Sequence, residues 1–95
     1  MNLKNLHTDN KPVQTNVVFI AEEGKVISLQ IAAREQLKEH ITKVPALLVC
    51  VFGNAVYQDE KGKSVELKPG DYVNIEANVK HLVDAKEDSN FLVIK

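Results

Sequence analysis

The stretch from His40 to Gly53 reads HITKVPALLVCVFG, and its second half is the strongest indication of the fold. The segment Ala46–Phe52 is a continuous apolar run, which is typical of a β-strand covered on both faces. Pro45 can begin such a strand but cannot sit in its middle. Gly53 and Asn54 permit a bend directly after it. We therefore predict a buried central strand over Ala46–Phe52.

The sequence on both sides of this run predicts further short strands separated by turns. Val17–Ile20 is β-branched and aromatic, which suits a pleated and half-buried surface. Val26–Ala32 alternates apolar and polar residues with the period of a strand. Pro69-Gly70 fits the central positions of a type II turn, because proline fixes φ and glycine accepts a positive φ.

The other expected strands lie at 55–59, 65–67, 72–75, 81–83 and 91–94. We interpret Ala33–Lys38, the one stretch of helix-favouring composition, as a connector because it is short and uncapped. Eight or so short strands with frequent turns and no long helix predict an all-β sandwich or barrel.

Length and composition allow one domain and exclude several functions. The 95 residues are expected to form a polar tail at 1–12, with a solvated His7, and a single domain at 13–95. The net charge is -1 and only one residue is arginine, so nucleic-acid binding has no electrostatic support. No membrane span and no signal peptide is visible, so we expect a cytoplasmic protein. Cys50 is the only cysteine, and we expect a buried, unreactive thiol.

Two segments resemble the motifs of the cupin superfamily of small barrels. The first motif has the form Gly-x5-His-x-His-x3-4-Glu-x6-Gly. In this sequence His40 matches its first histidine and Gly53 its closing glycine. Thr42 stands in place of the second histidine, Ala46 in place of the glutamate, and Arg34 in place of the leading glycine.

The second cupin motif has the form Gly-x5-Pro-x-Gly-x2-His-x3-Asn. Gly70 and His81 match it, whereas Glu76 replaces the proline and Ala85 the asparagine. Asn78 replaces the second glycine, which is tolerable because asparagine also adopts positive φ. The resemblance implies an all-β jelly-roll or double-stranded β-helix barrel, of the small conserved-barrel (cupin 2) type with a degenerate metal motif.

The resemblance also implies where a site lies. In metal-binding cupins the motif histidines and the glutamate point into the barrel together and hold a metal ion. Here His40 and His81 remain as candidate metal ligands, whereas the Thr42 hydroxyl is a poor ligand and Ala46 is none. Since side chains alternate along a strand, every second residue of the central strand is expected inside. The candidate ligand-binding residues are therefore His40, Thr42, Ala46, Leu48, Cys50, Phe52 and His81.

Three functions stay open on this sequence, so it does not decide whether the protein is an enzyme. The first is a non-catalytic module that binds a small molecule or a partner and has a depleted metal site. The second is a metal-dependent cupin enzyme, of dioxygenase or isomerase type. It would hold Zn, Ni, Fe or Mn on His40 and His81 with water or a carboxylate completing the shell. The third is a metal-free enzyme with the two histidines as acid and base.

Four charged residues and one strand complete the set of predictions. Arg34, Glu35, Glu39 and Glu76 are near enough in sequence to contribute to a site, but we expect each to be solvated. The strand predicted from Val13 to Ala21 leaves an edge that needs cover. Pairing with a second copy of the chain would cover it, so we expect a homodimer.

Overall fold

Nine β-strands and one short 3-10 helix make up the computed structural model, which describes residues 1–95. The helix, η1 (Leu3–Asn5), has only three residues, so no helix of this protein can cross a lipid bilayer. The strands are β1 (Val13–Ala21), β2 (Gly24–Ile31), β3 (Gln36–His40), β4 (Ala46–Phe52), β5 (Ala55–Asp59), β6 (Ser64–Leu67), β7 (Tyr72–Ile75), β8 (His81–Ala85) and β9 (Ser89–Ile94).

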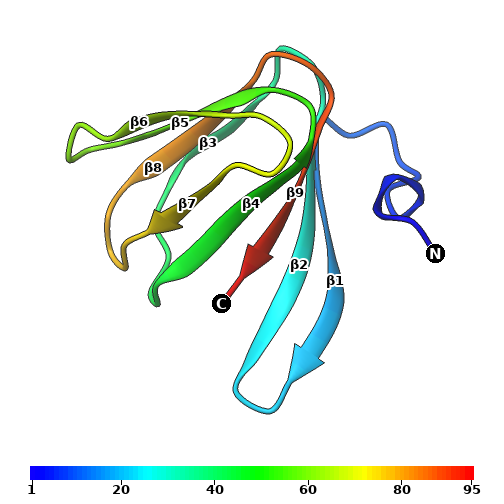
Figure 1. Ribbon diagram of the computed structural model, residues 1–95, viewed down its shortest axis with the longest axis horizontal. Coiled ribbons are helices and arrows are strands. Elements are labelled where there is room, and N and C mark those ends of the chain that lie inside the picture. The colour runs from blue at the N-terminus through cyan, green and yellow to red at the C-terminus, as the bar shows by residue number, and fades with distance from the viewer.

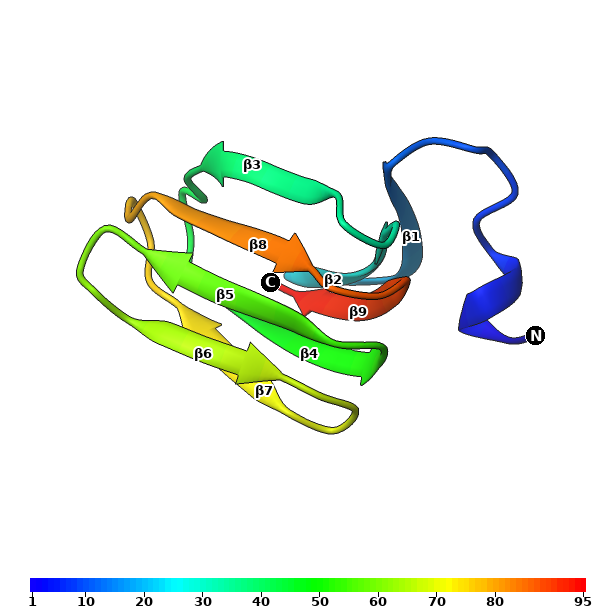
Figure 2. The same ribbon diagram turned by 90° about the horizontal axis from the view of Figure 1, so that it is seen from above.

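The strands form two antiparallel sheets that face each other (Figures 1 and 2). The larger sheet has the order β1-β2-β9-β4-β7, and the smaller has the order β3-β8-β5-β6. Strands that are distant in sequence are neighbours, since β9 lies between β2 and β4. This is the two-layer arrangement expected of a jelly-roll barrel, and it confirms the all-β prediction.

Side chains that alternate along the strands fill the space between the sheets. On β2, Leu29 and Ile31 are buried, and they pair with inward-facing residues of β9 such as Phe91. The core contains thirteen buried side chains, drawn from both sheets: Leu29, Ile31, Ala46, Leu48, Cys50, Ala55, Tyr57, Leu67, Val73, Ile75, Val83, Ala85 and Phe91. The predicted central strand coincides with β4, and its alternate residues Ala46, Leu48 and Cys50 all belong to this core.

The connector predicted at Ala33–Lys38 is wrong in its second half, because β3 begins at Gln36. β3 lies at an edge of the smaller sheet and pairs only with β8. All its residues except Leu37 are exposed, so its sequence carries no apolar alternation. The pairing with β8 imposes the strand on a sequence that has little preference for it.

Turn residues confirm two expectations from the motifs. Gly70 has φ of 93°, and the N–H of Asp71 donates to the carbonyl of Lys68 at 2.8 Å, as a turn centred on Pro69-Gly70 requires. Asn78 has φ of 64°, the left-handed conformation for which the motif uses glycine. Arg34, which replaces the leading glycine of the first motif, has φ of 66°. The chain therefore keeps the backbone of these turns without the glycines.

The first twelve residues are mostly exposed, but some of them contact the larger sheet. They run along the outer side of the larger sheet next to β1, as Figure 1 shows. His7 Nε2 lies 2.8 Å from the hydroxyl oxygen of Ser28, whose side chain is fully buried on β2. The prediction of a solvated His7 is wrong, because this contact with the sheet was not visible in the local sequence.

Candidate functional site

His40 and His81 are brought together by the pairing of β3 with β8. They are direct partners across the two strands, with an irregularity in β3 between Leu37 and His40. Their ring centroids lie 4.3 Å apart, with the ring planes inclined at 57°. His81 is 2% exposed, whereas His40 is exposed at the edge of the sheet. The two histidines of the motifs are therefore in contact, with His81 in the core and His40 at the surface.

Each imidazole is oriented by a backbone carbonyl. Nδ1 of His40 lies 3.1 Å from the carbonyl oxygen of Lys38, and Nδ1 of His81 lies 3.3 Å from that of Val79. A carbonyl only accepts hydrogen bonds, so these contacts assign the proton of each neutral ring to Nδ1. The two Nε2 atoms are left as acceptors.

Tyr57 and Asp59 support the buried histidine from β5. The ring of Tyr57 stacks on His81 with centroids 5.7 Å apart and an interplanar angle of 24°. Its hydroxyl donates to Oδ2 of Asp59 at 3.1 Å. Burial raises the pKa of Tyr57, and the hydrogen bond to Asp59 raises it further, so the hydroxyl stays protonated. The stacking of Tyr57 on His81 restricts the position of the His81 ring.

His81 is held in its neutral form. Burial lowers the pKa of its imidazole below the ordinary value of 6.5, although the carbonyl of Val79 opposes this shift. A positive charge on His40 or on Lys95 would lower the pKa of His81 further, while the carboxylate of Asp59 raises it. At neutral pH the buried ring is therefore uncharged and able to accept a hydrogen bond through Nε2.

A cavity of about 130 Å³ lies between the sheets and opens beside this pair. Its polar lining residues are Thr15, His40, Thr42, His81 and Lys95. Its apolar lining residues are Ile27, Leu29, Leu37, Leu48, Ile75, Val83 and Val93. The cavity wall is thus mostly apolar, with a smaller number of polar groups that include the two histidines.

Four of the seven predicted ligand-binding residues line this cavity: His40, Thr42, Leu48 and His81. Ala46 and Cys50 are buried on the same strand but pack in the core without lining it. Burial raises the pKa of the Cys50 thiol to about 11, and the charge of Asp71 raises it further. Cys50 is therefore a buried core residue, as the sequence predicts, and its thiol is protonated at neutral pH.

Phe52 lies on the opposite face of the sheet from the position that strict alternation predicts. The pairing of β4 with β9 shifts between Cys50 and Phe52, so Phe52 is placed opposite Asn90. Asn90 faces outward, since its side-chain amide donates to Ser28, the residue that contacts the N-terminal segment. The Lys4 ammonium lies 4.8 Å from the centre of the Phe52 ring. A β-bulge therefore removes Phe52 from the cavity.

Sequence reasoning missed Lys95 and Thr15 as cavity residues. Lys95 continues the alternation of Phe91 and Val93 along β9, and Thr15 pairs with the inward-facing Leu29. The alternation of residues 91, 93 and 95 could therefore have indicated that Lys95 shares a face with Phe91 and Val93. That this face lines the cavity depends on the position of β9 between β2 and β4.

The residues around the histidine pair do not make up a usual metal-binding set. No three side chains of histidine, cysteine, aspartate or glutamate lie close enough to share a metal ion. Thr42 Oγ1 is buried without a hydrogen-bond partner, and Ala46 contributes only a methyl group. Protein metal sites of this kind use three or four protein ligands, so the two imidazoles are one or two short.

The charged residues near the motifs do not line the cavity. Arg34, Glu35, Glu39 and Glu76 are all exposed, as predicted. Glu76 pairs with Lys61 at 3.3 Å. None of the four lines the cavity, so none completes a ligand set with the histidines.

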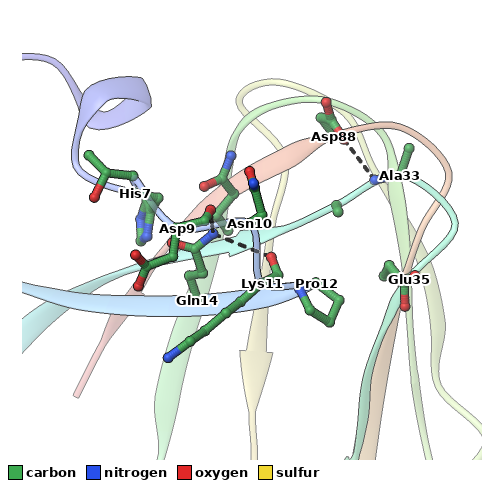
Figure 3. A pocket seen from close by; sticks show the side chains of 12 residues that line it. His7, Asp9, Asn10, Lys11, Pro12, Gln14, Ala33, Glu35 and Asp88 are labelled. Atoms are coloured by element: carbon green, nitrogen blue, oxygen red, sulfur yellow. Dashed lines mark hydrogen bonds between the residues drawn. The ribbon is translucent and has the colours of Figure 1, made fainter.

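The largest hollow on the molecule is a different one, shown in Figure 3. It has a volume of about 510 Å³ and lies between the N-terminal segment and the loops at the end of the sheets. Its lining is polar and of mixed charge, including Asp9, Lys11, Glu35 and Asp88. It contains none of the predicted site residues, and neither its charge nor its shape selects a ligand.

Comparison with known proteins agrees with this architecture. No protein-family model matches the sequence, and no curated protein is significantly similar to it. A cupin superfamily protein from Desulfitobacterium hafniense is similar in structure with a TM-score of 0.84 and 17% identity. That match covers 98% of this chain and 84% of the other.

Two more solved structures are similar over almost the whole chain. An RmlC-like cupin from Desulfovibrio desulfuricans has a TM-score of 0.83 and 19% identity, covering 98% of this chain and 90% of the other. KdgF from Halomonas sp. has a TM-score of 0.82 and 18% identity, covering 99% and 87%. Similarity at such low identity reports the fold and not the chemistry. This protein is therefore a small single-barrel protein with the cupin fold.

Proposed function

We propose that this protein is a non-catalytic module that binds a small molecule inside its barrel without a resident metal ion. The observation that carries the proposal is the cavity between the sheets, apolar along its wall and polar where His40, Thr42 and His81 meet. Binding sites for small molecules typically combine such an apolar wall with a few polar groups that orient the ligand. The cavity has a volume of about 130 Å³, and since an apolar cavity of about 150 Å³ can accept benzene, it suits a small ligand.

The chemistry of the lining supports binding over catalysis. The only thiol of the protein, that of Cys50, is protonated at neutral pH and does not line the cavity. The two histidines have no third protein ligand for a metal ion among histidine, cysteine and carboxylate side chains.

A cavity-filling variant tests the proposal. Val93 lines the cavity, whereas the adjacent Leu92 points to the other face of β9. A library of small fragments is screened against the labelled protein by NMR. Fragments that shift resonances of the cavity residues should lose binding in Val93→Phe and keep it in Leu92→Phe. Fragments that bind equally well to both variants, or that never reach the cavity, would contradict the proposal.

A metal-dependent enzyme is the second candidate, and one observation favours it. Both histidines keep Nδ1 on a backbone carbonyl and leave Nε2 free, which is how metal-ligating histidines are commonly oriented. Elemental analysis of protein purified without added metal distinguishes the two candidates. One tightly bound ion per chain that disappears in both His40→Ala and His81→Ala would contradict the first candidate and support the second.

We also propose that the protein forms a homodimer through β1. This strand is the edge of the larger sheet, and its residues Val17, Val18, Phe19 and Ile20 are all exposed. It contains no charged residue and no proline, the features that usually protect an edge strand. An antiparallel pair of identical strands is two-fold symmetric, so a second copy is the natural partner.

Light scattering of matched variants tests the dimer. Phe19 on β1 is 60% exposed, and Tyr72 on β7, at the opposite edge of the same sheet, is 62% exposed. Phe19→Lys should produce monomers, and Tyr72→Lys should leave dimers. A wild-type protein that is monomeric at micromolar concentration would refute the proposal. A cytoplasmic location is likewise proposed, in keeping with the free thiol of Cys50, and cell fractionation checks it.

A further inference from the structure

The lining of the barrel cavity is one-sided in charge. Among its twelve residues there is no aspartate and no glutamate, whereas Lys95, His40 and His81 contribute basic groups. Lys95 reaches the cavity from the end of β9, on the same face as Val93. The ammonium of Lys95 is therefore not opposed by a carboxylate within the lining, and it favours an anion there.

The lining also holds a polar atom without a partner. Thr42 is 9% exposed, and its Oγ1 is buried without any hydrogen bond. The backbone of Thr42 is fixed, since its carbonyl accepts from the N–H of Asn78 at 2.7 Å. A buried hydroxyl without a partner is unfavourable, so a ligand that accepts a hydrogen bond from it would relieve that cost.

The rest of the wall is aliphatic. Leu29 and Leu48 are at most 2% exposed, and Val83 is fully buried. These side chains can only contact a hydrocarbon group favourably, because they offer no hydrogen-bond donor or acceptor. The cavity thus combines a cationic, hydrogen-bonding end with an aliphatic interior in a volume of about 130 Å³.

We propose that the ligand of this cavity is a small monocarboxylate with an aliphatic chain, held by Lys95 and Thr42 at the carboxylate and by the aliphatic wall along its chain. This inference rests on the proposed binding function and adds the chemical class of the ligand. The ammonium of Lys95 donates to the carboxylate at the mouth, where the exposed lysine keeps the ion pair partly hydrated. The hydroxyl of Thr42 donates to the second oxygen, and the chain lies against Leu29, Leu48 and Val83.

Calorimetric titration with three probes of equal chain length tests the class of ligand. Hexanoate should bind, hexan-1-ol should bind more weakly by about tenfold, and hexylamine should not bind detectably. Butanoate and octanoate test the size of the cavity, and both are expected to bind more weakly than hexanoate. Binding of hexanoate should weaken with added salt, and binding of hexan-1-ol should not.

Two substitutions with one control test the residues. Lys95→Gln should weaken the binding of hexanoate by about tenfold and leave the affinity for hexan-1-ol unchanged. The control is Lys25→Gln, because Lys25 is hydrogen-bonded to Lys95 through the backbone but does not line the cavity. Thr42→Val keeps the shape and removes the unpartnered hydroxyl, so the variant should fold as well as the parent and still lose affinity for hexanoate.

The outcomes separate this inference from the proposed function. Equal affinity for hexanoate and hexan-1-ol, unchanged by Lys95→Gln, would overturn the carboxylate class while binding in the cavity stands. If none of the probes shifts NMR resonances of the cavity residues, the carboxylate class is also overturned. In that case fragment binding lost in Val93→Phe would keep the proposed function, and its absence would remove both.

Discussion

Single residues in left-handed backbone conformations hold the turns of this barrel. Gly53, Gly70, Arg34 and Asn78 all have positive φ, between 64° and 102°. They differ in what surrounds them and in whether a side chain is present. The cost of a substitution at each therefore depends on both the backbone and the neighbouring atoms.

Gly53 should be the least replaceable of these residues. A Cβ on Gly53 would meet the carbonyl oxygen of Asp88 and the Cα of Ser89, each at 2.6 Å, whereas a Cβ on Gly70 meets nothing within 4 Å. We expect Gly53→Ala to lower the free energy of unfolding by about 2–4 kcal/mol, from the clash and the backbone together. Gly70→Ala, the control, should lose only about 1 kcal/mol. Urea unfolding measures both, and equal losses would contradict this account.

Replacing Arg34 by glycine should stabilise the folded protein. Its φ of 66° is unfavourable for a residue with a side chain, and the exposed guanidinium forms no ion pair within the chain. We expect Arg34→Gly to raise the free energy of unfolding by about 0.5–1 kcal/mol, since relief of strain exceeds the added flexibility of the unfolded chain. Asn78→Gly should change stability by less than about 0.5 kcal/mol, because asparagine tolerates this conformation. A destabilised Arg34→Gly variant in thermal or urea unfolding would refute the argument.

At the scale of the strands, bulges decide which face a side chain occupies. The pairing is irregular between Val17 and Phe19 on β1, between Leu37 and His40 on β3, and between Cys50 and Phe52 on β4. Each bulge changes the alternation of side chains beyond it. The bulge on β4 is the reason that Phe52 contacts Lys4 on the outer face instead of the cavity.

The stability of two phenylalanine variants tests this assignment of faces. Phe91 is fully buried in the core, and Phe52 is half-buried on the outer face. We expect Phe91→Ala to lower the free energy of unfolding by about 3–5 kcal/mol. Phe52→Ala should lose only about 1–2 kcal/mol, for the burial of part of the ring and its contact with Lys4. A loss at Phe52 as large as that at Phe91, measured by denaturant unfolding, would place Phe52 in the core.

At the scale of the whole molecule, the N-terminal segment is attached to the larger sheet through a buried polar group. Ser28 receives a hydrogen bond from the Asn90 side chain at 3.0 Å and contacts His7 Nε2 at 2.8 Å. Since Asn90 donates to the Ser28 oxygen, the Ser28 hydroxyl is free to donate to a neutral His7. The segment is thus joined to the two central strands β2 and β9.

This attachment should depend on pH. Burial lowers the pKa of His7 below its ordinary value of 6.5. The charged residues that line the same hollow are of both signs: Asp9, Lys11, Glu35 and Asp88. The folded protein then binds fewer protons than the unfolded chain at this site, so stability falls as pH falls below about 6.5. Urea unfolding of the wild type and of His7→Gln at neutral pH and near pH 5 measures the effect. The wild type should lose more stability than the variant, and an equal loss would contradict the attachment.

The local sequence was sufficient for much of the architecture. Apolar alternation on β2 and the apolar run of β4 follow from the two-residue period of an extended chain, which each segment carries by itself. The turn at Pro69-Gly70 and the positive φ of Asn78 follow from the conformational preferences of single residues. The motif spacing indicated His40 and His81 together, and the pairing of β3 with β8 places them in contact.

Only the tertiary structure decided which of these residues share a cavity. β3 is a strand because β8 pairs with it, Phe52 faces outward because a bulge shifts its pairing, and His7 is half-buried because Ser28 lies beneath it. Lys95 reaches the cavity because β9 lies between β2 and β4. The physical reason is common to all four. Local patterns record backbone preference and burial, whereas register, bulges and strand order arise from contacts between segments that are distant in the chain.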